Sequence, residues 1–160
     1  MLALRATSLV MACCFASAAG AADGLIAVQS PYSVKETIDR FETAAKSRGI
    51  NVFLRLDHAQ GAKKVGKDLR PTELLVFGNP QGGTPLMECA QTAGIDLPLK
   101  ALAWQDAAGQ VWLAYNDPKY LASRHGADNC GPVAENMSKA LGGITQPSIN
   151  ERTRPARPRR

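Results

Sequence analysis

Two histidines, His58 and His125, are the residues of this chain best suited to acid–base or metal chemistry. No His-x-x-x-His, Cys-x-x-Cys or carboxylate spacing of a known metal site accompanies them, and there is no Ser/His/Asp signature or nucleophile elbow. We therefore favour a surface or helix-capping role for each, and catalysis would require both to converge in one pocket. Such a pocket could recruit Asp57 beside the first histidine, and Tyr115, Asn116, Asp117 and Arg124 upstream of the second.

A glycine-rich segment from Asn79 to Thr84 is a second candidate site. It joins a predicted strand to a predicted helix that Thr84 caps and Pro85 begins, so its backbone amides could hold an anion. It is neither a Walker loop nor a G-x-G-x-x-G fingerprint, and a simple sharp turn is the favoured interpretation. The candidate ligand-binding residues are His58, Asn79, Gly82, Gly83, Thr84, Tyr115, Asn116, Arg124 and His125.

The first 21 residues have the three parts of a cleavable signal peptide: Arg5, an apolar stretch from Ala6 to Phe15, and small residues with two Ala-x-Ala sites. The apolar stretch is too short to span a bilayer, so no stable membrane anchor is expected. A buried N-terminal helix and lipid modification at Cys13 or Cys14 are the alternatives. We expect an exported protein, periplasmic or secreted.

Cleavage would leave two cysteines, Cys89 and Cys130. Two cysteines in an oxidising compartment usually pair, so we predict a disulfide. A reactive thiol pair or a metal site would be the alternatives, and neither has a supporting spacing. No metal or cofactor is predicted.

The excess of basic residues lies at the ends of the chain. The net charge is +5, but the last ten residues carry five arginines and one glutamate, and Arg5 is another positive charge. The remainder has equal numbers of acidic and basic residues, which argues against a nucleic-acid partner. Residues 146–160 are predicted to be a disordered basic tail.

Removing both ends leaves one domain, residues 22–145. Apolar residues recur at helical spacing after Ser33, which predicts a helix that Ser33 caps and Gly49 ends. A strand is expected next, because Ile50, Val52, Leu54 and Leu56 alternate along one face. Four consecutive apolar residues, Leu74–Phe77, predict a central strand covered on both faces. The other expected elements are strands at 24–29, 97–104 and 111–115, and helices at 59–66, 84–94, 117–126 and 131–143.

This order, in which only some strands are separated by helices and the last two form a hairpin, favours an α+β fold. We predict a two-layer domain with a mixed or mainly antiparallel sheet and helices packed on it. Trp104, Trp112 and Tyr115 lie on the hairpin, where core or dimer packing is favoured over a stacking platform for bases or sugars.

Three segments carry a resemblance to a known family: residues 70–87, 96–104 and 111–118, together with Arg124-His125-Gly126. They resemble the domain-of-unknown-function family 302 over most of residues 24–141. The resemblance implies a compact two-layer α/β fold and homodimers, and it carries no established activity.

Two functions from different classes therefore compete. The preferred one is a non-catalytic module that binds a small ligand or a protein partner. The alternative is a small hydrolase or metal-dependent enzyme that uses His58 and His125. The first is preferred because it needs no converging catalytic groups.

Overall fold

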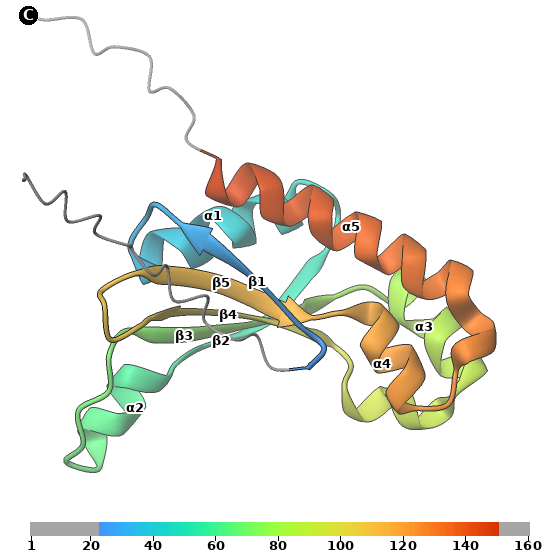
Figure 1. The fold of residues 1–160 in the computed structure, drawn as a ribbon, viewed down its shortest axis with the longest axis horizontal. Coiled ribbons are helices and arrows are strands. Elements are labelled where there is room, and N and C mark those ends of the chain that lie inside the picture. The colour runs from blue at the N-terminus through green and yellow to red at the C-terminus, as the bar shows by residue number, and fades with distance from the viewer. Residues whose placement is uncertain (1–22, 151–160) are drawn as a thin grey trace, which may run out of the picture.

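The computed structural model describes residues 23–150 (Figure 1). The predicted signal peptide and residues 151–160 of the predicted tail lie outside the described residues. Within residues 23–150 the fold is the predicted α+β architecture, with helices packed on one sheet.

In the described part of the chain, five strands form a single sheet in the order β1-β5-β4-β3-β2, and every neighbouring pair is antiparallel. Strands β4 and β5 are the predicted hairpin. The strands are β1 (Leu25–Ser30), β2 (Asn51–Asp57), β3 (Thr72–Gly78), β4 (Leu99–Gln105) and β5 (Val111–Asn116).

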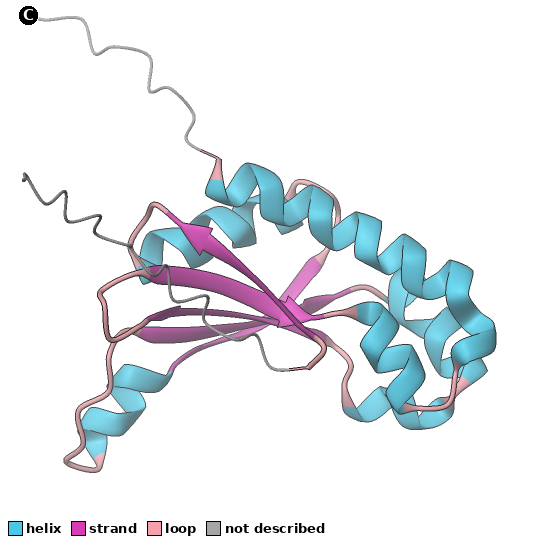
Figure 2. Ribbon diagram, viewed as in Figure 1, coloured by secondary structure: helices cyan, strands magenta, loops and turns pink. Residues whose placement is uncertain are grey.

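The helices lie over one face of the sheet and at its two ends (Figures 1 and 2). Helices α1 (Val34–Lys46) and α5 (Gly131–Ile149) cover the same face, with α1 against β2 to β5 and α5 against α1. The remaining helices are α2 (His58–Lys64) at one end, and α3 (Pro80–Cys89), the 3-10 helices η1 (Gln91–Ile95) and η2 (Asp128–Cys130), and α4 (Pro118–Arg124) at the other.

Helix α1 forms where its local sequence predicts it. Ser33 Oγ accepts a hydrogen bond from the Glu36 amide at 3.2 Å, and Gly49 ends the turn after the helix with a φ of +71°. Ile38 and Phe41 are fully buried, and the Phe41 ring meets Phe77 of β3 edge to face at 5.1 Å. This contact belongs to the core between α1 and the sheet.

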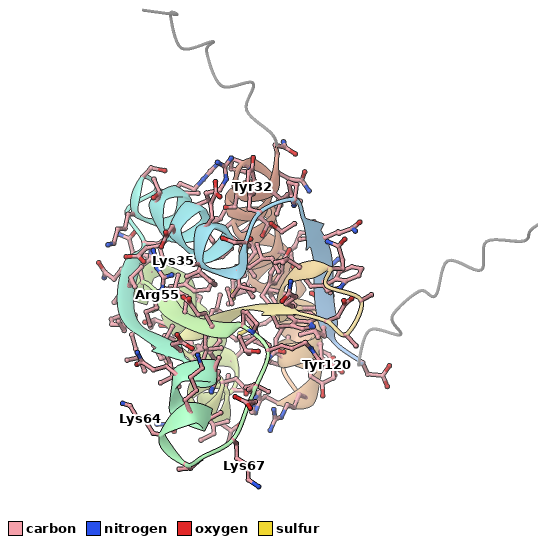
Figure 3. All side chains as sticks on the ribbon, turned by 90° about the vertical axis from the view of Figure 1, so that its left-hand side faces the viewer. Tyr32, Lys35, Arg55, Lys64, Lys67 and Tyr120 are labelled. Carbon is pink, nitrogen blue, oxygen red and sulfur yellow. A yellow bond between two sulfur atoms is a disulfide. The ribbon has the colours of Figure 1, made fainter. Side chains whose placement is uncertain are left out.

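A β-bulge in β2 turns the side chains that follow it to the other face of the sheet, so the predicted alternation of Ile50, Val52, Leu54 and Leu56 on one face is wrong. Val52 pairs with Phe77, but the register shifts before Leu54, which pairs with Val76. Because one extra residue moves the following side chains to the other face, Val52 packs on the core while Leu54 points to the opposite side of the sheet. Figure 3 shows Arg55 beside Lys35 of α1, which places Arg55 on the helix-covered side.

Helix α3 begins earlier than predicted. The segment expected to be a loop, 79–84, forms its first turn: Asn79 is the N-cap and Pro80 takes the first helical position, whereas Pro85 lies inside the helix. Both Asn79-Pro80 and Thr84-Pro85 are cap–proline pairs. The structure uses the first, with the Asn79 side chain accepting from the Gly82 amide at 2.7 Å.

Helix α5 continues past Gly142-Gly143, where the sequence predicted its end, to Ile149. Ile144 and Ser148 are buried, so tertiary packing outweighs the low helix propensity of glycine. The Arg48 guanidinium lies where a side chain at residue 143 would stand, 3.2 Å from its Cβ position, and donates to the Gly143 carbonyl at 2.8 Å. Residues 146–150 of the predicted tail therefore belong to the domain.

Candidate functional site

A groove of about 590 Å³ opens between α3, α5 and the adjoining ends of β2, β3 and β4. We call it the α3–α5 groove. Its walls come from segments that are far apart in the sequence, and they meet because antiparallel β2 begins where β3 ends and β4 begins. The groove is therefore a product of the sheet topology.

The interior of the groove is apolar. Phe77 and Leu99 come from the sheet, Leu97 from the segment before β4, and Met137 and Ile144 from α5. Three of these side chains, Phe77, Met137 and Ile144, are also part of the buried core. A ligand in the groove would therefore rest directly on the hydrophobic core.

Neutral polar side chains complete the lining: Asn79, Gln81 and Thr84 from α3, and Asn136 from α5. Within residues 23–150, no charged residue is among those that line the groove. Such a site can donate hydrogen bonds from amide and hydroxyl groups to a neutral ligand, but it offers no side-chain charge to an ionic one.

Helix α3 buries fewer of its residues than α5, which forms the facing wall of the groove. Leu86 is its one buried residue, and the helix packs mainly on η1, α5 and η2. A disulfide joins Cys89 at the end of α3 to Cys130 immediately before α5, with their Cα atoms 6.4 Å apart. The predicted cysteine pairing is thus present in the structure, where it ties the two walls of the groove together.

Four of the predicted site residues line the groove: Asn79, Gly82, Gly83 and Thr84. Their arrangement differs from the predicted anion cradle, because the Gly82 and Gly83 amides both donate within α3 to Asn79. A side chain at Gly82 would crowd the capping oxygen, which is 3.3 Å from the position of its Cβ. The glycines therefore allow the tight cap.

His58 does not share this site. It is half-buried at the start of α2, and α2 and α3 lie at opposite ends of the sheet (Figure 1). The seven residues of β2 separate the two ends by roughly 20 Å. Asp57, its predicted partner, caps α2 by accepting from the Gln60 amide at 2.8 Å.

His125 belongs to a separate hydrogen-bonded cluster between α4 and η1. Its Nε2 lies 2.8 Å from Asp96 Oδ2, and its Nδ1 lies 3.0 Å from Thr92 Oγ1. Arg124 Nη1 donates to Asp96 Oδ1 at 3.3 Å. Both imidazole nitrogens are occupied and the His125 side chain is 8% exposed, so this cluster fastens α4 to η1.

Tyr115 and Asn116 are also outside the groove. Tyr115 is 7% exposed and packs in the core beneath α1, and half-buried Asn116 is the last residue of β5. His58 and His125 therefore do not converge with each other or with Asn79. Among the described residues, no three His, Cys, Asp or Glu side chains are grouped to hold a metal ion.

Several groove residues were not among the predicted site residues. Val133, Met137 and Leu141 recur at helical spacing in the sequence of the predicted last helix, and all three line the groove. Phe53 is 56% exposed at the β2 bulge and also lines it. A large exposed aromatic residue is a signal for such a site, but its position depends on a bulge that the alternation concealed.

Within residues 23–150, no helix combines the length and apolar character needed to cross a membrane.

Comparison with known proteins gives related sequences and a related structure. The chain is 52% identical over 124 residues to proteins named fluoride-specific ion channel FluC 1 from Brucella suis biovar 1 (strain 1330) and Brucella abortus biovar 1 (strain 9-941). The match spans 77% of this chain but 49% and 46% of those proteins, about half their length.

The fold matches a crystal structure described as an uncharacterized conserved protein DUF302 from Bacillus stearothermophilus. The TM-score is 0.72 at 22% identity, covering 79% of this chain and 99% of that one. Residues 26–144 match the family described as domain of unknown function DUF302. The resemblance noted in the sequence is confirmed, and this chain belongs to the DUF302 family.

Proposed function

We propose that this domain is a non-catalytic binding module that takes a neutral, mainly apolar small molecule in the α3–α5 groove. The observation that carries the proposal is the lining of the groove, in which apolar side chains predominate and the polar side chains are uncharged. Neither histidine of the chain is part of that lining.

The dimensions support a small-molecule ligand. Ligand sites usually enclose about 300–1,000 Å³ and combine apolar walls with a few polar groups. The α3–α5 groove, at about 590 Å³, falls within this range. Met87 and Met137 face it from α3 and α5, and their flexible thioethers can adapt to ligands of different shapes.

The polar residues favour a ligand with a neutral hydrogen-bonding group. Asn79 Oδ1 already accepts from the Gly82 amide, which leaves the donor side of this side chain to face a ligand. Gln81 and Asn136 bring further amides to the groove. A carbonyl or hydroxyl group at one end of an apolar molecule would satisfy these donors, whereas a carboxylate would lose hydration without gaining a cation.

We also propose that the protein is exported. The signal-peptide pattern of the first 21 residues motivates this proposal, and the Cys89–Cys130 disulfide supports it because disulfides persist in oxidising compartments. Intact-mass measurement of protein from a bacterial periplasm would test it. A chain beginning at Ala19 or Ala22 is expected. An uncleaved chain would contradict export, and a lipid on Cys13 or Cys14 would contradict cleavage at the two Ala-x-Ala sites.

For the longer relatives, we propose that the shared half is a domain of the same kind joined to the remainder of those proteins. The match extends over less than half of each relative. The ion-channel activity in their name is not transferred to this chain.

The groove is tested with a neutral fluorescent probe, N-phenyl-1-naphthylamine, whose emission rises in apolar surroundings. We expect saturable binding by the wild type. Ala140→Trp should weaken binding at least tenfold, because Ala140 is an exposed α5 residue that lines the groove and an indole there would fill its mouth. The anionic analogue 8-anilinonaphthalene-1-sulfonate should compete poorly.

The matched control is Gln146→Trp, which places the same side chain at an exposed position of α5 outside the groove. This variant should bind the probe like the wild type. Equal binding by all three proteins would place the probe elsewhere and overturn the proposal, as would the absence of saturable binding.

A further inference from the structure

Residues 63–70, the end of α2 and the loop after it, stand clear of the rest of the domain (Figure 1). We call them the basic tip. All eight of these residues are exposed, and α2 itself has no buried residue. The helix lies at the end of the strands and packs mainly on β3. Within residues 23–150 no helix crosses the sheet face opposite α1, so the prediction that β3 is covered on both faces is wrong.

Backbone hydrogen bonds define the turn of the basic tip. The Gly66 amide donates to the Lys63 carbonyl at 3.1 Å. The Lys67 amide donates to the Ala62 carbonyl at 3.0 Å, and the two bonds together make the Schellman arrangement of a helix end. Gly66 provides the positive φ, 70°, that this turn requires. The turn is therefore formed without burial of its side chains.

The basic tip concentrates positive charge in a domain that is otherwise balanced. It contains four basic residues and one acidic residue, a net charge of +3, whereas residues 6–150 as a whole have equal numbers of the two kinds. In the described part of the chain, the lysines that form ion pairs lie elsewhere: Lys35, Lys46, Lys119 and Lys139. Lys64 and Lys67 project outward from the tip (Figure 3). This separation of charge turns the tip toward an anionic surface.

Two large apolar side chains lie among these charges. Val65 is 74% exposed at the turn, and Leu69 is 48% exposed on the return to β3. A bilayer surface accommodates both kinds of side chain, because aliphatic groups enter the acyl boundary while lysines reach the headgroups. The tip has no aromatic residue on which a nucleic-acid base could stack. Its chemistry therefore favours a lipid surface over a nucleic acid.

We propose that the basic tip binds reversibly to the surface of an anionic phospholipid bilayer. Val65 and Leu69 enter the boundary between headgroups and acyl chains, and the three lysines contact lipid phosphates. Because the tip projects beyond the sheet, a flat surface reaches it without meeting the rest of the domain (Figure 1). The α3–α5 groove is at the opposite end of the sheet, so this proposal does not depend on a ligand in the groove.

Co-sedimentation of the full chain with lipid vesicles tests the proposal. We expect binding to equimolar phosphatidylglycerol and phosphatidylcholine, and little binding to phosphatidylcholine alone. A basic residue near an anionic surface strengthens binding roughly fivefold. The lysines of the tip should therefore account for at least a tenfold loss of affinity in the triple variant Lys63→Gln, Lys64→Gln and Lys67→Gln.

The matched control removes the same charge from other parts of the surface. Its lysines lie on α1, α4 and α5, and their side chains are 74%, 62% and 71% exposed. The control is the triple variant Lys35→Gln, Lys119→Gln and Lys139→Gln, which should bind vesicles like the wild type. Both triple variants keep the N-terminal segment and the arginines of residues 151–160. Equal weakening in the two would show that net charge alone causes binding and would overturn the proposal.

The double variant Val65→Ser with Leu69→Ser tests insertion into the bilayer. It keeps every charge of the tip, and it should bind at least fivefold more weakly because two aliphatic side chains no longer leave water. Wild-type affinity in this variant would overturn the proposed insertion. A wild type that does not bind the anionic vesicles would overturn the whole proposal, including one that instead binds a single-stranded oligonucleotide through the tip.

Discussion

Removal of the disulfide should have a large and local effect. The bond joins Cys89 to Cys130 across 41 residues, closing a loop that contains η1, β4, β5, α4 and η2. The perturbation is the double substitution Cys89→Ser and Cys130→Ser, with reduction of the wild-type protein as an independent route to the same state.

The magnitude follows from the length of the closed loop. In the chain-entropy description, closing a loop of 41 residues lowers the conformational entropy of the unfolded chain and so stabilises the fold by about 4 kcal/mol at 25 °C. For a domain of this size, that loss corresponds to a decrease in the melting temperature of roughly 10–20 °C. Because α3 packs mainly on η1, α5 and η2, its amides should also exchange hydrogen sooner than those of α1.

Urea unfolding and hydrogen exchange provide the assay. The oxidised wild type should unfold at a clearly higher urea concentration than either the double variant or the reduced wild type. Its slope should be the shallower one, because the crosslink keeps the unfolded chain more compact. The reasoning is refuted if the midpoints coincide, or if exchange accelerates equally in α1 and α3. A wild-type protein with two free thiols at Cys89 and Cys130 would contradict the pairing itself.

Two further predictions concern the C-terminus and acid stability. Deleting residues 146–160 should lower the free energy of unfolding by roughly 2 kcal/mol, because Arg40 donates to the Ser148 and Asn150 carbonyls at 2.9 and 3.0 Å and Ser148 is buried. Deleting only residues 151–160 should leave the thermal melt unchanged. Equal effects of the two deletions would contradict the assignment of residues 146–150 to the domain. A hydrogen bond from Lys35, opposed by partial burial and reinforced by Arg55, holds the pKa of Asp39 below its ordinary value. A lowered folded-state pKa stabilises the fold above the unfolded pKa of about 3.9 and ceases to do so as the pH falls through the folded value. Thermal melts of Asp39→Asn should therefore depend less steeply on pH between 5 and 2 than those of the wild type, and parallel curves would show that Asp39 does not contribute.

The elements that could be predicted are those whose signals are local. The Ser33 cap, the spacing of Ile38 and Phe41, and Gly49 specify α1 without reference to the rest of the chain. The β4–β5 hairpin is also local, because its two strands adjoin in sequence. The order of the elements was enough to infer an α+β fold, since few of the strands are separated by helices long enough to act as parallel crossovers.

The errors arose where tertiary contacts decide between local alternatives. Helix α5 passes through Gly142-Gly143 because buried Ile144 and Ser148 hold its last turns and Arg48 occupies the space beside Gly143. The bulge at Phe53 leaves no signature in the apolar alternation of β2. Both features depend on residues that are distant in sequence.

The candidate site was predicted only in part for the same reason. Asn79, Gly82, Gly83 and Thr84 form one wall of the groove, but the opposite wall comes from α5, more than 40 residues later in the chain. Residue type alone made His58 and His125 candidate site residues. Their separation by the length of the sheet is a consequence of topology that residue spacing does not show.

Methionine-methyl NMR tests the central claim, that the α3–α5 groove binds neutral apolar ligands, most directly. The chain has four methionines: Met1 and Met11 in the predicted signal peptide, and Met87 and Met137, which face the groove from its two walls. On titration with N-phenyl-1-naphthylamine, the Met87 and Met137 methyl signals should shift together and saturate, while any signals from Met1 and Met11 stay in place. Probe binding that leaves both the Met87 and Met137 signals unmoved would contradict the account.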